Sequence, residues 1–176
     1  MNARLWRLCI GRLGVLLLGT WNIPRALHWP DRCPLGNIPE FRLVVPGFGL
    51  SLVWEVMQSP FYTDTFTSPW TTVAFNRLHC AVGDALILLA AFWIVALCWG
   101  RFWMRMPSWA SCLAFLVPAL AYTAGSEYVN VRVLQRWAYS SWMPTVAGMG
   151  LVPLLQWVIV PSVSMYYASK GMTRSG

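Results

Sequence analysis

The chain has 176 residues, of which 57% are hydrophobic and only 11% are charged. Soluble domains carry about 25% charged residues, so the composition excludes an ordinary soluble domain and predicts an integral membrane protein of one domain. In so apolar a chain, we expect the net charge of +7 to set topology and to contact lipid phosphates. With no recognition motif present, we expect no nucleic-acid partner.

Residues 1–24 contain three arginines before a short apolar run at residues 13–21. This run is much shorter than the roughly 20 residues that cross the hydrocarbon layer, so we expect an N-terminal amphipathic or short hydrophobic helix at the membrane surface. A short spanning helix and a signal peptide are the alternatives, and the absence of a small-x-small cleavage pattern after Trp21 weakens the second. Residues 25–42, with scattered prolines and charges, are expected to form a loop.

Four later segments are apolar and long enough to span a membrane. They are residues 43–62, 78–99, 108–125 and 146–167. The predicted fold class is therefore all-α, a polytopic bundle of four transmembrane helices over residues 43–168 with a polar tail at residues 169–176. Between the third and fourth spans, residues 126–144 are expected to continue the helix or to form an interfacial helix.

Basic residues predict the orientation, because Lys and Arg accumulate on the cytoplasmic side of a membrane. With four spans, ten basic residues lie on the side of both termini and three lie on the other side. Counting residues 13–21 as a fifth span divides the same residues six to seven and removes the bias. We therefore predict a multi-pass protein of a bacterial-type plasma (inner) membrane with both termini in the cytoplasm.

Polar side chains follow one stripe of the first span. Ser51, Glu55, Gln58 and Tyr62 are spaced at i, i+4, i+7 and i+11, which places them on one helix face. Ionisable groups are costly inside a bilayer, so we expect this stripe to turn toward the bundle interior.

The second span opens with polar residues and is otherwise apolar. Arg77, Cys80 and Asp84 share one stripe, while His79 and Gly83 form the neighbouring one. We expect Gly83 to let another backbone approach beside the charged groups.

The polar ends of the first three spans are expected to converge in the outer leaflet. The first span ends there, the second begins there, and the third ends there before Glu127, Asn130 and Arg136. We assign candidate roles accordingly. The candidate catalytic residues are Glu55, His79, Asp84 and Glu127, and the candidate ligand-binding residues are Gln58, Tyr62, Asn130 and Arg136.

These residue types suit three kinds of chemistry. Carboxylates and an imidazole in a low-dielectric site can act as acid and base on a lipid-like substrate, hold a divalent metal, or relay protons or a cation. No HExxH or ExxH motif fixes a metal geometry, so the cofactor stays open, with Glu55 and His79 as the candidate ligands. No basic residue lies within two helical turns of Glu55, and His79 enters from the next helix to accept its proton or share a metal.

The alternative is that the same groups only hold helices together. In that interpretation Asp84 pairs with Arg77, and Glu127 pairs with Arg132 or Arg136. Gln156, alone in the last apolar segment, is interpreted as a packing residue.

We expect a membrane protein that binds or acts on a lipid-like or small hydrophobic substrate. The alternative is a structural or assembly subunit of a membrane complex, and a small ion or metal transporter is third, because four spans must usually dimerise to enclose a path. The expected partners are membrane lipid and either a second copy or another membrane protein.

The topology gives the first testable prediction. A reporter fused after Gly176 and a second one inserted within residues 64–72 should lie on opposite sides of the membrane, because three predicted spans separate them. Protease or thiol-labelling accessibility measures this directly, and reporters found on the same side would contradict the four-span topology.

Overall fold

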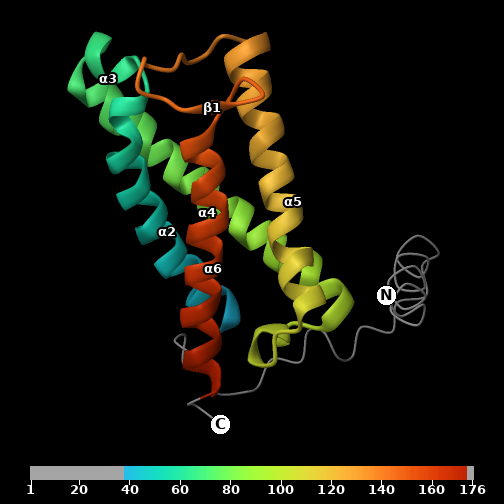
Figure 1. Ribbon diagram of the computed structural model, residues 1–176. Helices are drawn as coiled ribbons and strands as arrows, with labels where there is room; N and C mark the ends of the chain where they lie inside the picture. The colour runs from blue at the N-terminus through green and yellow to red at the C-terminus, as the bar shows by residue number, and fades with distance from the viewer. Residues whose placement is uncertain (1–37, 174–176) are drawn as a thin grey trace, which may run out of the picture.

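Four long helices, running alternately up and down, build the bundle (Figure 1). The computed structural model describes residues 38–173. The helix predicted at residues 1–24 and most of the loop predicted at residues 25–42 lie outside the described residues. The all-α fold class is confirmed, and the four helices are α2 (Pro39–Gln58), α4 (Trp70–Trp99), α5 (Trp109–Tyr128) and α6 (Leu151–Thr173).

α2 begins before the expected start of the first span. Pro39 occupies its first turn, where the fixed φ of proline suits a helix and its missing N–H has no helical partner to lose. The helix ends at Gln58 and the 3-10 turn η2 (Ser59–Phe61) follows, because Pro60 has no N–H with which to continue the ladder.

α4 also begins earlier than the sequence suggested. After the one-turn helix α3 (Asp64–Thr67), the carbonyl oxygen of Pro69 accepts hydrogen bonds from the backbone N–H groups of Thr72 and Val73 at 3.0 and 3.2 Å. The helix that follows has 30 residues, more than the roughly 20 needed to span a bilayer. It ends at Trp99, and the next residue, Gly100, takes a φ of +89° that suits glycine.

α5 begins with a capping box. The Ser111 N–H donates to Ser108 Oγ at 3.2 Å, and the Ser108 N–H donates to Ser111 Oγ at 2.9 Å. The π-helical turn η4 (Val129–Val133) extends it, so the predicted helical continuation is confirmed that far. Beyond this turn Gln135 takes a φ of +49° and the chain crosses back over the end of the bundle (Figure 1).

The predicted start of the fourth span at residue 146 is wrong. β1 (Thr145–Val146) and β2 (Met149–Gly150) pair as an antiparallel hairpin. Ala147 and Gly148 between them have φ values of +52° and +79°, as a two-residue hairpin turn requires. α6 therefore starts only after β2 and continues into the segment expected to be a polar tail.

Three described helical segments are long and apolar enough to cross a membrane, which indicates a multi-pass membrane protein. They are Trp70–Trp99, Trp109–Val133 and Leu151–Met172. α2 carries Glu40, Arg42 and Glu55 and is not among them, so the fourth span stays a prediction.

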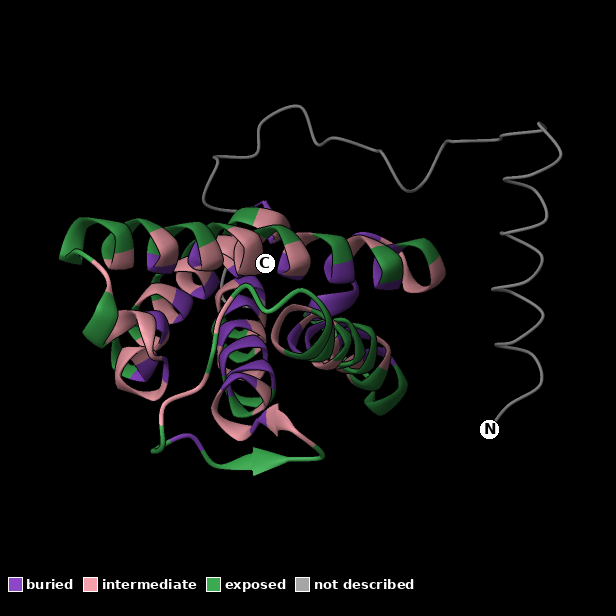
Figure 2. Ribbon diagram, turned by 90° about the horizontal axis from the view of Figure 1, so that it is seen from above, coloured by how far each residue is buried: buried purple, intermediate pink, exposed green. Residues whose placement is uncertain are grey.

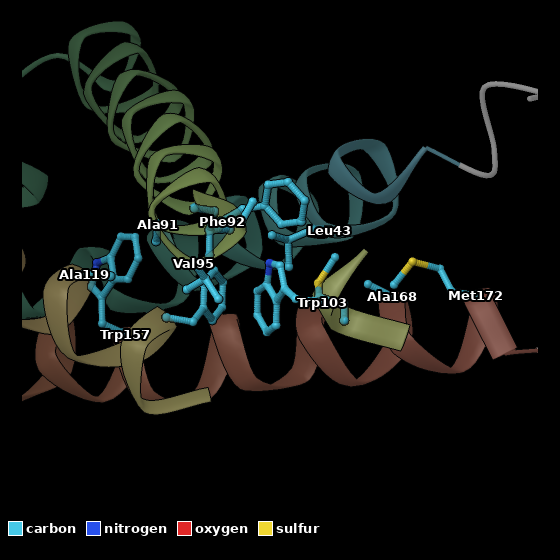
Figure 3. Packing of buried hydrophobic residues seen from close by; sticks show 13 residues of the cluster. Leu43, Ala91, Phe92, Val95, Trp103, Ala119, Trp157, Ala168 and Met172 are labelled. Carbon is cyan, nitrogen blue, oxygen red and sulfur yellow. The ribbon is translucent and has the colours of Figure 1, made fainter. Parts of the chain in front are cut away.

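Apolar packing holds the bundle together along its inward faces (Figure 2). α2 packs against α4 and α6, and α5 packs against the same two helices. The core includes Leu43, Phe92, Val95, Trp103 and Trp157, whose side chains interdigitate in Figure 3. The outward faces also carry large exposed apolar side chains, as expected for a surface in contact with lipid.

A buried ion pair closes the end of the bundle near η3 (Trp103–Arg105). Arg101 donates from Nε to Oε1 of Glu40 at 2.8 Å and from Nη2 to Oε2 at 3.0 Å. The two side chains are only 8% and 12% exposed. The pair therefore fixes the first turn of α2 to the chain that follows α4.

This ion pair predicts a measurable loss of stability. Arg101→Met leaves the Glu40 carboxylate buried without its partner, which should lower the free energy of unfolding by about 3 kcal/mol and lower the Tm in detergent. Arg105→Met is the matched control, because Arg105 is exposed and lies over the Phe102 ring. The double variant, Glu40→Met with Arg101→Met, removes both charges and should restore part of the lost stability. Equal Tm values for the single variants Arg101→Met and Arg105→Met would contradict the role of the pair.

Candidate functional site

A pocket lies at the end of the bundle opposite η3. α4 and α5 come together near η3 and diverge toward the end that carries α3 and β1 (Figure 1). A cavity of about 640 Å³ lies between their diverging halves. The last turn of α2 and the first turns of α6 complete its wall.

All eight candidate site residues line this one pocket. Three of the four candidate catalytic residues, Glu55, Asp84 and Glu127, are largely enclosed, whereas His79 is exposed. The eight residues are Glu55, Gln58, Tyr62, His79, Asp84, Glu127, Asn130 and Arg136.

Gln156 joins the carboxylates of α2 and α4. Its Nε2 donates to Asp84 Oδ2 at 2.6 Å, and its side chain also lies against the Glu55 carboxylate. The Ser51 side chain also lies beside Asp84. The structural alternative that paired Asp84 with Arg77 is therefore wrong. The sequence interpretation of Gln156 as a packing residue missed these contacts. A single amide in a long uncharged apolar segment could have indicated a polar partner.

The loop that follows η4 supplies the hydrogen-bond partner of Glu127. The Tyr139 hydroxyl donates to Glu127 Oε2 and accepts from the backbone N–H of Gly150 at 2.8 Å. The Trp137 side chain also lies beside this carboxylate. The pairing of Glu127 with Arg132 or Arg136 is therefore wrong. Burial, and then the bond to Glu127, raises the pKa of Tyr139, so the phenol keeps its proton and remains a donor.

Arg77 belongs to the wall rather than to the carboxylate cluster. Its Nη2 donates to Asp64 Oδ1 at 2.6 Å and its Nε donates to Ser59 Oγ at 3.0 Å. The guanidinium also lies over the Tyr62 ring, 5.1 Å from its centroid. The ion pair between Asp64 and Arg77 thus holds the α2–α4 connection against α4. Asp64 was not among the candidate residues predicted from the sequence.

Two loops cover the pocket and are bonded to each other. The Thr63 N–H donates to the Ala138 carbonyl oxygen at 3.0 Å, and the Ser140 N–H donates to the Phe61 carbonyl oxygen at 2.9 Å. Ser140 Oγ adds a bond to the Pro60 carbonyl oxygen at 2.8 Å. The segment after α5 is therefore fastened to the segment after α2 across the end of the bundle.

The exposed lining residues mark where the pocket opens. His79 on α4, Tyr122 on α5 and Arg136 beyond η4 are exposed. The His79 ring stacks on Phe75, with 6.2 Å between the ring centroids, and within the described structure no hydrogen bond or ion pair joins it to Glu55. These three residues lie on α4, on α5 and beyond η4, so the pocket opens where α4 and α5 diverge, with His79 at its edge.

Gly83 does not serve the close backbone contact that the sequence suggested. A Cβ added at this position would have no atom within 4 Å. Gly83 instead lines the pocket between His79 and Asp84, so the absence of a side chain leaves the mouth open.

Two buried amide oxygens in the pocket lining have no hydrogen-bond partner. They are Gln58 Oε1 and Asn130 Oδ1. Buried polar groups in folded proteins are nearly always paired, so these two oxygens are exceptions among the buried polar atoms of the lining. Within residues 38–173 no group of three or more His, Cys, Asp or Glu side chains is arranged to hold a metal ion, and Glu55 and His79 as metal ligands stay a prediction.

Compared with protein-family models, with curated proteins and with solved structures, the chain matched none.

The Tyr139 bonds give a testable prediction. Tyr139→Phe leaves the Glu127 carboxylate without its phenol donor and the Gly150 N–H without its acceptor, so we expect a loss of about 1–3 kcal/mol, measured as a lower Tm in detergent. Tyr128→Phe is the control, because Tyr128 neighbours Glu127 on α5 but is exposed. If both variants unfold at the same temperature, Tyr139 does not hold the wall of the pocket.

Proposed function

We propose that this chain is a plasma (inner) membrane protein with four spans, α2 included, and cytoplasmic termini, which binds a lipid-like or small hydrophobic molecule in the pocket between α4 and α5. The observation that carries the proposal is a polar pocket lined by two helices that are apolar enough to span a membrane, with an exposed lining residue on each. An opening between these helices would face lipid, so a molecule dissolved in the bilayer could enter it.

The two parts of an amphiphile fit the two parts of the pocket. Glu55, Gln58 and Gln156 are each at most 5% exposed and supply polar groups at the inner wall. Ile87, Tyr122 and Trp157 supply apolar or aromatic surface in the same lining. A polar group bound at the inner wall would let an attached apolar chain leave through the mouth into the bilayer. Placed polar groups beside apolar or aromatic walls are a common feature of small-molecule sites.

A reaction on the bound molecule would use the carboxylates. Asp84 and Glu55 are both oriented by Gln156, and Glu127 is oriented by Tyr139. Carboxylates held in this way are suited to accept or return a proton at the polar group of a substrate. In this proposal His79, at the mouth, contacts the ligand as it enters rather than exchanging a proton with Glu55.

Closing the mouth tests the proposal. Gly83→Leu places a side chain in open space at the pocket opening and should reduce lipid copurified from native membranes by about tenfold, the scale of roughly 1–3 kcal/mol of steric overpacking. Native mass spectrometry of the protein in mild detergent measures bound lipid.

Gly49→Leu is the matched control, because Gly49 also lies in a helix with no atom within 4 Å of an added Cβ but is not part of the lining. Equal lipid retention by the two variants would contradict the proposal. A stoichiometric protein partner without bound lipid would favour the alternative of an assembly subunit.

A further inference from the structure

We propose that the polar group held in this pocket is an ammonium group that carries N–H donors, such as the headgroup of an aminoethyl lipid or a free alkylamine. The inference deepens the proposed function and rests on it. It starts from the orientation of the amide side chains that line the pocket, because an amide shows either an oxygen acceptor or a nitrogen donor to a ligand.

Gln58 offers an oxygen acceptor. The residue is only 3% exposed and its Oε1 has no hydrogen-bond partner. Its amide lies against the Glu55 carboxylate, and because an ionised carboxylate only accepts hydrogen bonds, the amide nitrogen must face Glu55. The unpartnered oxygen is therefore on the other side of the amide.

Asn130 offers a second oxygen acceptor from another helix. Its Nδ2 donates to the Ser126 carbonyl oxygen at 2.8 Å and to Ser126 Oγ at 3.1 Å. A carbonyl oxygen cannot donate, so this contact fixes the nitrogen and leaves Oδ1 without a partner. Gln58 on α2 and Asn130 beyond α5 thus each have a buried amide oxygen that lacks a donor.

The charges in the lining also favour a cation. Within residues 38–173 neither Glu55, Asp84 nor Glu127 takes part in an ion pair. Arg77 is bound to Asp64, and Arg136 is exposed at the mouth. An ammonium group supplies both a positive charge and up to three donors, whereas a phosphate or carboxylate would face more carboxylates and acceptor oxygens.

Aromatic rings in the same lining would also attract a quaternary ammonium group, so the experiment must distinguish it from an ammonium group that carries N–H donors. Tyr62, Tyr122, Trp137 and Trp157 line the pocket, and aromatic faces attract any ammonium, including a quaternary one. A trimethylammonium group has no N–H, however, and leaves Gln58 and Asn130 unpaired. The two headgroups therefore give opposite expectations at the same site.

The experiment uses the full chain in vesicles of equal parts phosphatidylethanolamine, phosphatidylcholine and phosphatidylglycerol. After extraction in mild detergent, mass spectrometry should show phosphatidylethanolamine enriched about tenfold over phosphatidylcholine, as expected for charge-assisted hydrogen bonds that only the primary amine can make. Excess octylamine should displace it and octanol should not. Octylamine binding without retention of phosphatidylethanolamine would identify the free amine as the source.

A pair of variants tests the acceptor itself. Asn130→Asp and Asn130→Leu both lose the Nδ2 bonds to Ser126, but only the aspartate keeps an acceptor. Asn130→Asp should retain the preference and Asn130→Leu should reduce it, with Gln58→Met reducing it as well. Unchanged preference in Asn130→Leu and Gln58→Met, or enrichment of phosphatidylcholine or phosphatidylglycerol, would overturn the ammonium assignment while lipid binding stands. Absence of any bound lipid or amine would overturn the proposed function too.

Discussion

A buried polar group in an apolar medium is costly until it finds a partner, and this constraint organises one end of the molecule. There Asp84 receives a hydrogen bond from α6, Glu127 receives one from the loop after η4, and Arg77 pairs with Asp64 in the α2–α4 connection. Each partner comes from a different element. These three contacts join α4 to α6, α5 to the loop after η4, and α4 to α3. None of the three joins α4 directly to α5, and the space between those two helices remains as the pocket.

The opposite end follows the ordinary rule of close apolar packing. Phe92, Trp103 and Phe115 form a tilted aromatic series with 6.1 and 5.6 Å between successive ring centroids. The buried pair of Arg101 and Glu40 lies at the same end. One end is thus packed and fixed while the other is polar and hollow, an arrangement in which a rigid scaffold positions a site.

Helical periodicity was enough to predict the membrane class, the all-α fold and the gathering of polar residues at one end. Glu55, Asp84 and Glu127 lie on inward stripes, and antiparallel neighbours bring those stripes to the same level. The hydrogen-bond partners of these carboxylates could not be predicted from the sequence. Tyr139 contacts Glu127 only because the chain reverses at Gln135 and Ala147, both with positive φ. The spacing of hydrophobic residues along the sequence does not predict such reversals. Helix starts were misplaced for a similar reason, since Pro39 and Pro69 act through local geometry rather than hydropathy.

The hydrogen bonds between the loops after α2 and α5 have a consequence for how this site can change over evolution. At the diverging end, the separation of α4 and α5 depends on the lengths of two connections fastened at Tyr62 and Tyr139, not on side-chain volumes at a helix interface. Loops tolerate insertions better than packed cores do. Adding or removing a residue in residues 134–150 would therefore change the size of the mouth without disturbing the apolar core at the opposite end.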